Sequence, residues 1–309
     1  MRPPYAAPVA PVTFEDRLPA VCELVAAAGR RVMELFRLPL VAARKEDNSL
    51  VTNADHAANE ILTTGLRGAF PGDMILSEET GLEGPAGAAL TWLVDPLDGT
   101  RAYAKGAPGF SVMVGLLEAG RPVLGVVFDP LNQRLFAAAR GAGAREWARG
   151  EWIPLRVSAR NEWNAMPLIT STGFPPEMRQ NVERALRVRF LHPINSVGVK
   201  VGYIVRGLAD LYLNHHPVHH WDTAAPLVIL EEAGGRMTHW DGSALDYADP
   251  RRLHTQPPIA SNGRATRISS ARSPPCPSHE KAPVPRALRG NGTRPGLGRP
   301  RGGSALGGV

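Results

Sequence analysis

The stretch WLVDPLDGT (residues 92–100) decides how the rest of this chain is interpreted, because it puts two carboxylates at the end of an apolar run. Residues 90–94 predict a buried strand, and we expect Pro96 to end it, since proline offers no N–H group to a ladder. Asp95 and Asp98 would then lie on the loop that leaves the strand. Carboxylates in this position favour the binding of a cation.

The last two residues of the stretch suit the binding of an anion. Gly99 lets a ligand approach the backbone closely, and Thr100 is predicted to cap a short helix through Ala104. The first N–H groups of a helix have no partner within the helix and would face a group such as phosphate. Carboxylates for cations next to amides for phosphate are typical of metal-assisted phosphate chemistry.

The composition is that of a globular protein without a disulfide framework. The chain has 309 residues, of which 43% are hydrophobic, and this length suits one large or two ordinary domains. The two cysteines, Cys22 and Cys276, lie far apart in the sequence, and we expect a reducing cytoplasm as the compartment. The sequence contains neither a secretion signal nor an apolar run long enough to span a bilayer. We therefore expect neither secretion nor membrane insertion.

The positive charge is concentrated in the last 45 residues. The formal net charge is +6, but residues 265–309 alone carry +7 and leave the remainder at −1. Fifteen of these 45 residues are proline or glycine and none is aromatic. We predict a disordered basic tail here and a flexible N-terminus at residues 1–12. Because the tail has no Phe, Tyr or Trp ring on which bases could stack, a nucleic-acid partner is not expected.

Residues 13–151 predict an α+β half. Thr13 is expected to cap a helix that ends near Leu38, and Asn53 to cap a second helix that ends near Arg67. Strands are predicted at residues 74–76, 90–94, 109–117, 122–128 and 134–139, and the last three would form an antiparallel meander.

Residues 152–264 predict an α/β half, because strands and helices alternate there. Strands are expected at residues 168–170, 210–213 and 235–240, and helices at residues 176–188, 196–206 and 223–233. Across both halves, Glu78, Asp95, Asp98 and Asp222 each lie where a strand or helix ends, which allows their carboxylates to converge. Such oxygen ligands suit Mg²⁺, and two ions held there would clamp an in-line displacement at phosphorus.

Three motifs resemble the signatures of the inositol monophosphatase superfamily of Mg²⁺-dependent, Li⁺-sensitive phosphatases. They are WLVDPLDGT, LSEE at residues 76–79 and HHWDTAAPLVILEEAGG at residues 219–235, and the match covers about residues 14–263 in the same order. The resemblance implies a layered αβαβα sandwich of the inositol monophosphatase and fructose-1,6-bisphosphatase type. Because members of this family are often dimers, the resemblance also implies that this chain can form a homodimer.

The resemblance assigns metal ligands residue by residue. It implies that Glu78, Asp95 and the Leu97 carbonyl bind a first Mg²⁺ ion. It also implies that Asp95, Asp98 and Asp222 bind a second.

The resemblance also assigns the catalytic groups. Asp55 and Thr100 match the pair that positions and activates the attacking water, and Glu78 lies beside them as a ligand. The N–H groups of Gly99 and Thr100 match the phosphate cradle. Glu79 would lie behind the ligands, with a part in a third, weaker metal site.

Four short sequence segments resemble the 3′(2′),5′-bisphosphate nucleotidases of sulfur assimilation more than the inositol enzymes. They are RKEDNSLVTNAD, DGTRAYAKG, SVGVK and THWDGSALDY. The basic residues in them, Arg101, Lys105 and Lys200, would hold a second phosphate on the substrate. The resemblance thus implies hydrolysis of 3′-phosphoadenosine 5′-phosphate to AMP and phosphate.

Two other phosphatase activities remain open. An inositol-1-phosphate phosphatase would carry a glutamate shortly before the WD motif, where this chain has YLNHHP at residues 212–217. The bisphosphate nucleotidases often carry a polar group nearby, which Asn214 or His215 matches loosely, and His215 is therefore a candidate substrate contact. A histidinol-phosphate phosphatase resembles the chain from DGTRAYAKGAPGF to GRPVLGVV, but fits Trp221 and Asp222 less well.

Three further alternatives concern other features. The cluster His215, His216, His219 and His220 suggests a transition-metal site, a substrate contact or a plain loop. An inactive, phosphatase-like binding protein is the non-enzymatic alternative, and the intact carboxylates count against it. The family's closing helix is not expected after the SNG at residues 261–263, because residues 264–290 lack helical periodicity.

Overall fold

The computed structural model describes residues 13–39, 42–44, 50–251 and 253–264. The predicted flexible N-terminus (residues 1–12) and the predicted basic tail (residues 265–309) lie outside these described residues. None of the helices in the described part of the chain combines the length and apolarity that crossing a membrane requires.

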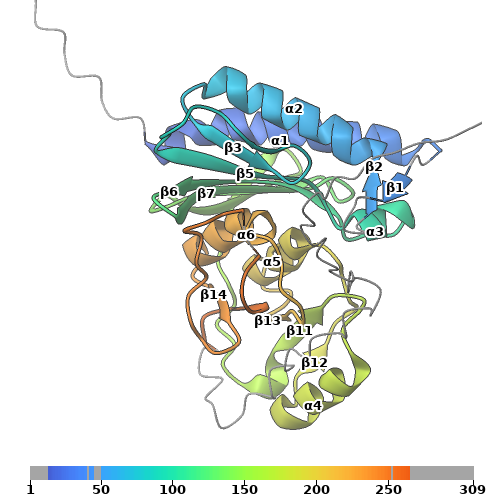
Figure 1. Cartoon of the computed structure of the whole chain (residues 1–309). Coiled ribbons are helices and arrows are strands. Elements are labelled where there is room, and N and C mark those ends of the chain that lie inside the picture. Colours follow the sequence, from blue (N-terminus) through green and yellow to red (C-terminus); the bar gives the residue numbers. More distant parts are fainter. Residues whose placement is uncertain (1–12, 40–41, 45–49, 252, 265–309) are drawn as a thin grey trace, which may run out of the picture. The chain divides into compact units, whose positions relative to one another are not determined.

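An eight-stranded sheet forms the first sheet layer (Figure 1). Its strands run in the order β10-β9-β8-β7-β6-β5-β3-β4, with β3 and β5 parallel and the other neighbours antiparallel. The strand bounds are β3 (Met74–Ser77), β4 (Gly81–Glu83), β5 (Leu90–Asp98), β6 (Ser111–Glu118), β7 (Arg121–Asp129), β8 (Arg134–Ala139), β9 (Gly143–Ala148) and β10 (Glu151–Pro154). The predicted meander is confirmed as β6, β7 and β8, whereas β9 and β10 were not predicted.

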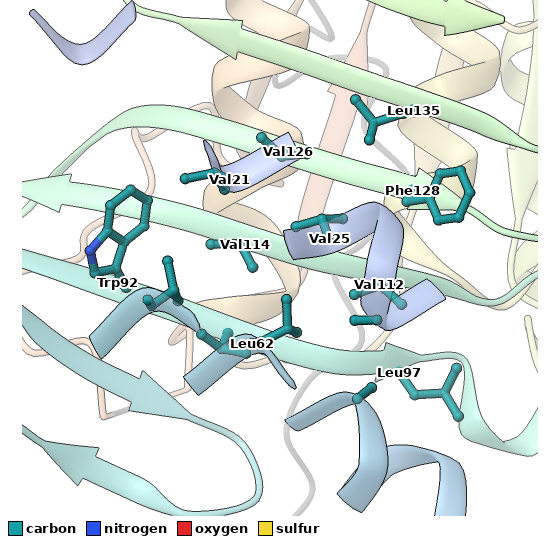
Figure 2. Packing of buried hydrophobic residues seen from close by; sticks show 14 of the residues in the cluster. Val21, Val25, Leu62, Trp92, Leu97, Val112, Val114, Val126, Phe128 and Leu135 are labelled. Carbon is teal, nitrogen blue, oxygen red and sulfur yellow. The ribbon is translucent and has the colours of Figure 1, made fainter. Parts of the chain in front are cut away.

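Two long amphipathic helices, α1 (Phe14–Phe36) and α2 (Asn53–Ala69), cover one face of this sheet. Val21 and Val25 of α1 and Leu62 of α2 pack against Val114 and Val126 of the sheet (Figure 2). These apolar positions recur at helical spacing, which is why the sequence alone predicts both helices. A two-stranded sheet of β1 (Ala42–Arg44) and β2 (Leu50–Thr52) lies between them in the chain.

Helices α5 (Val197–Val205) and α6 (Trp221–Glu232) contact the same sheet through a second hydrophobic cluster, and α6 contacts β5 to β9. The approach is close at Gly125, where a Cβ atom would lie 2.3 Å from the Ala225 carbonyl oxygen. Glycine is thus needed at this point of β7 for α6 to pack against the sheet.

A five-stranded sheet forms the second sheet layer and contacts α5 and α6. Its strand order is β12-β11-β13-β15-β14. Helix α4 (Pro176–Leu186) packs on it through a third cluster that includes Val182, Leu186 and Leu211. The succession of two helices, sheet, two helices, sheet and helix confirms the predicted αβαβα layering (Figure 1). The remaining elements are α3 (Thr100–Ala104), a short 3₁₀ helix (Trp163–Ala165), β11 (Pro167–Thr170), β12 (Arg189–Phe190), β13 (Leu211–Leu213), β14 (Arg236–His239) and β15 (Pro258–Ser261).

Candidate active site

Strand β5 carries Asp95 and Asp98 across a bulge at its C-terminal end. Two residues three positions apart point to opposite faces of a regular strand. Here Asp95 pairs with Met113 and Asp98 with Ser111, so that two residues of β5 oppose one residue of β6. The extra residue allows both carboxylates to face the same side. The expectation that Pro96 ends the strand is therefore wrong, because a bulge tolerates a residue without an N–H group.

Asp222, in the first turn of α6, completes a group of three carboxylates. One oxygen from each of Asp95, Asp98 and Asp222 lies within 4.8 Å of the others. Burial and the neighbouring carboxylates raise the pKa of Asp95 and of Asp222 well above the ordinary value. Burial also raises the pKa of Asp98. Such a group is costly in the folded protein unless a cation or a proton neutralises it.

The donor atoms of this group fit a hard divalent cation. All are carboxylate oxygens, and Asp95 Oδ2 is buried without a hydrogen-bond partner in the described part of the chain. Glu78, directly after β3, lies near enough for its charge to raise the pKa of Asp95 and Asp222. The Leu97 carbonyl, the remaining predicted ligand, accepts a hydrogen bond from Thr100 Oγ1 at 2.9 Å.

Backbone and hydroxyl groups at two helix N-termini hold these carboxylates. Ser196, the N-cap of α5, donates from Oγ to Asp98 Oδ2 at 2.7 Å, and the Gly198 N–H donates to the same oxygen at 3.2 Å. At the start of α6, the His219 N–H donates to Asp222 Oδ2 at 2.7 Å. The hydrogen bond between Ser196 and Asp98 therefore connects residues 152–264 with residues 13–151.

Asp55 and Thr100 contact each other although 45 residues separate them in the chain. Thr100 Oγ1 lies 3.1 Å from Asp55 Oδ1 and 2.9 Å from the Leu97 carbonyl oxygen, and its single proton serves one of these acceptors at a time. Asp55 is 2% exposed, and burial raises its pKa in spite of hydrogen bonds that act in the opposite direction.

The start of helix α3 requires a glycine. Gly99 has a φ of 91°, and a Cβ atom there would lie 2.5 Å from the Gly109 carbonyl oxygen. Gly99 is the N-cap residue and Thr100 is the first residue of the helix. The expectation that Thr100 caps the helix is therefore wrong, and its hydroxyl points instead to Asp55 and Leu97.

Lys200 of α5 is completely buried beside the carboxylates. Its Nζ atom donates to Ser171 Oγ at 2.8 Å and to the Asn195 carbonyl oxygen at 2.9 Å. Burial lowers the pKa of Lys200 to about 8, and the charges of Asp98 and Asp222 oppose this shift. A positive charge thus faces the acidic group from the second half of the chain.

The other three candidate substrate contacts are more peripheral. Arg101 and Lys105, in and just after α3, are exposed, and among the described residues neither forms an ion pair. His215 is half-buried, with its ring against that of Phe174 at a centroid distance of 5.6 Å, and burial lowers its pKa. Their roles stay predictions.

The histidines near residue 220 pack on one another and on Trp221. The rings of His220 and His254 have centroids 4.4 Å apart, and His254 Nε2 lies 2.7 Å from Thr223 Oγ1. The ring of His219 stacks on Trp221 at 4.2 Å. In the residues that the structure describes, the metal-ligand spacing is met by the three-aspartate group and by no set of histidines.

Two residues that hold the site's carboxylates, Thr52 and Ser196, are not among the residues that we predicted from the sequence. For Thr52 the signal is present, because Thr52 and Asp55 have the spacing of a helix capping box. Thr52, and not Asn53 as expected, is the N-cap of α2. Ser196 carries no comparable signal, since its contact with Asp98 depends on how the two halves of the chain meet.

Comparisons with known proteins agree on one family. The model of the inositol monophosphatase family matches residues 14–273. The 3′(2′),5′-bisphosphate nucleotidase CysQ of Salmonella typhimurium is 33% identical over 249 residues, which are 78% of this chain and 97% of that protein. The Nus factor SuhB of Xylella fastidiosa is 31% identical over 241 residues, which are 75% of this chain and 84% of that protein. The structure of inositol monophosphatase from Anabaena matches with a TM-score of 0.67 and 30% identity, and covers 82% of this chain and 92% of its own.

Proposed function

The chain belongs to the inositol monophosphatase family of phosphatases, and we propose that it hydrolyses 3′-phosphoadenosine 5′-phosphate to AMP and phosphate with the help of Mg²⁺. The observation that carries the choice of substrate is the buried Lys200, whose charge faces Asp98 and Asp222. The similarity of the chain to the CysQ nucleotidase supports the same substrate.

The proposed metal ligands follow from the donor atoms described above. We assign Glu78, Asp95 and the Leu97 carbonyl to one Mg²⁺ ion, and Asp95, Asp98 and Asp222 to a second. Bound there, Mg²⁺ supplies Lewis-acid chemistry that neutralises phosphate oxygens and makes water a better nucleophile near neutral pH. A third, weaker ion near Glu79 stays a prediction.

Asp55 and Thr100 are proposed to hold the attacking water and to take its proton. When Thr100 donates its hydroxyl proton to Asp55, the Thr100 oxygen is left as an acceptor for the water. Burial raises the pKa of Asp55, which makes its carboxylate a stronger base than an exposed aspartate. The N–H groups of Gly99 and Thr100, at the start of α3, are proposed to bind the phosphate.

The second phosphate of the substrate is proposed to contact Lys200. A buried ammonium group forms a strong, charge-assisted hydrogen bond with an anion that enters the site. Arg101, Lys105 and His215 would add contacts at the periphery. A substrate with a single phosphate leaves Lys200 without this partner, and this difference is the proposed basis of selectivity.

An inositol 1-phosphate phosphatase is the second candidate, because the inositol monophosphatase from Anabaena has a similar fold at 30% identity. The absence of a glutamate at residues 212–217 argues against it. Histidinol phosphate is the third substrate to test.

A substrate panel with a Lys200→Met variant tests the choice. We expect the wild-type chain with Mg²⁺ to have its highest kcat/KM on 3′-phosphoadenosine 5′-phosphate. The variant should lose about tenfold or more in kcat/KM on this substrate, and much less on inositol 1-phosphate, because a hydrogen bond to a charged group contributes about 1.5–3 kcal/mol. A wild-type preference for inositol 1-phosphate would overturn the proposed substrate.

Three properties of the family carry over to this chain as further proposals. We propose inhibition of the hydrolysis by Li⁺, a cytoplasmic location and a homodimer. Light scattering on the purified chain checks the last of these, and a Li⁺ titration of the hydrolysis checks the first.

A further inference from the structure

Helix α2 begins with a capping box whose acidic member is Asp55. The Thr52 N–H donates to Asp55 Oδ2 at 2.8 Å, and Thr52 Oγ1 donates to the same oxygen at 2.6 Å. Thr52 Oγ1 also accepts a hydrogen bond from the Ala54 N–H at 3.2 Å. In a capping box the residue three positions after the N-cap accepts a hydrogen bond from the N–H group of the N-cap and so stabilises the start of the helix. Here the same carboxylate also contacts Thr100.

The two oxygens of Asp55 have different partners. Oδ2 takes both donors of Thr52, and Oδ1 faces Thr100 Oγ1 at 3.1 Å. The terminal torsion of an aspartate is otherwise broad, so these three hydrogen bonds fix the plane of the carboxylate. Thr52 is 1% exposed and Asp55 2%, and hydrogen bonds to a charged group are strong where water is excluded.

We propose that Thr52 is a positioning residue for the reaction: it holds Asp55 Oδ2 so that Oδ1 is the oxygen presented to Thr100. This inference rests on the proposed function, in which Asp55 takes a proton through Thr100. The hydrogen bonds of the Thr52 hydroxyl within the described part of the chain go to Asp55 and Ala54, neither of which is a proposed metal ligand or part of the proposed phosphate cradle. Thr52 therefore acts through Asp55.

The chain contains a matched control for this role. At the start of α1, Thr13 and Asp16 form the same capping box, with the Thr13 N–H and Oγ1 each donating to Asp16 Oδ2 at 2.9 Å. This box is exposed and contains no proposed site residue. A comparison of the two boxes therefore separates the start of a helix from the orientation of a catalytic carboxylate.

The experiment compares Thr52→Val, Thr52→Ser and Thr13→Val in the full chain, with 3′-phosphoadenosine 5′-phosphate and Mg²⁺. Thr52→Val should lower kcat about tenfold or more, because a misplaced proton acceptor loses much of its effect. KM and the Mg²⁺ affinity measured by calorimetry without substrate should stay within about twofold of wild type, since Thr52 is buried and donates to Asp55, which is not among the proposed metal ligands. Thr52→Ser, which keeps the hydroxyl, should restore kcat to within about threefold of wild type.

Thr13→Val should leave kcat within about twofold of wild type, while it shifts the melting temperature as a lost helix cap does. Equal kcat values for Thr52→Val and Thr13→Val would overturn the proposal. Should Thr52→Val fail to fold, Thr52→Gly replaces it, because glycine is tolerated as an N-cap and also lacks the hydroxyl that donates to Asp55. Wild-type kcat in Thr52→Gly would also overturn the proposal. A wild-type chain that hydrolyses no phosphomonoester would instead overturn the proposed function on which the proposal rests.

Discussion

Asp95 is the residue around which the candidate site is built. It is 1% exposed, and its Oδ2 atom has no hydrogen-bond partner within the described residues. Burial and the charges of Glu78, Asp98 and Asp222 raise its pKa. A carboxylate in such surroundings destabilises the metal-free fold and gains most from a bound cation.

Replacement of Asp95 by Asn should therefore raise the melting temperature without Mg²⁺ and remove its dependence on Mg²⁺. Without Mg²⁺, the variant should melt a few degrees above wild type, because one of several buried like charges is removed. With Mg²⁺, the variant should show no further rise, because a shared ligand is lost. Thermal unfolding in EDTA and in Mg²⁺ measures both effects.

Asp129→Asn is the matched control, since Asp129 is also buried but lies outside the three-carboxylate group and hydrogen-bonds to Asn132. It should keep the wild-type response to Mg²⁺. A wild-type response in Asp95→Asn would show that Asp95 is not a metal ligand.

At the scale of elements, the N-termini of α2, α5 and α6 each hold one carboxylate of the site. Thr52 holds Asp55, Ser196 holds Asp98, and the His219 N–H holds Asp222. Hydrogen bonds of this kind fix the orientation of a ligand, and the positive end of each helix favours the charged form of the carboxylate. The helices therefore preorganise the site before any ligand binds.

Ser196→Ala should weaken Mg²⁺ binding about tenfold or more, because Asp98 Oδ2 loses its hydroxyl donor. Calorimetric titration measures this directly. Ser111→Ala is the control, since the Ser111 hydroxyl contacts Ser196 Oγ at 2.8 Å and makes no hydrogen bond to Asp98 among those of the described residues. Equal affinities of Ser196→Ala and wild type would contradict a role of the α5 N-terminus in the metal site.

The sequence predicts the elements better than it predicts the local geometry that joins them. The apolar periodicity of α1 and α2 is strong, because each helix has one buried face. The strands of the meander are nearly continuous apolar runs, because helices cover both faces of their sheet. Strand β10 was missed because its four residues are all exposed, so no alternation marks it. The bulge in β5 was missed because Pro96 is an ordinary stop signal, and only pairing with β6 shows that the strand continues. The motifs nevertheless predict Asp95, Asp98 and Asp222 as neighbours, and the structure brings them together.

At the scale of the whole molecule, the candidate site needs both halves of the chain. Asp95 and Asp98 come from β5 of the first sheet, and Glu78 directly follows β3. Asp222 and Lys200 come from α6 and α5. Bound Mg²⁺ would thus connect elements that are far apart in the sequence. The charges of Asp98 and Asp222 act on the buried Lys200, the residue that we propose contacts the second phosphate of the substrate.

The most direct test of this account is the release of phosphate from 3′-phosphoadenosine 5′-phosphate by the purified full chain, followed with Mg²⁺, after EDTA treatment and after Mg²⁺ is restored. We expect hydrolysis to AMP with Mg²⁺, its loss in EDTA and its recovery when the metal returns, because Mg²⁺ is the proposed source of Lewis-acid chemistry in this site. Hydrolysis that persists at the same rate in EDTA, or no hydrolysis of this substrate with Mg²⁺ present, would contradict it.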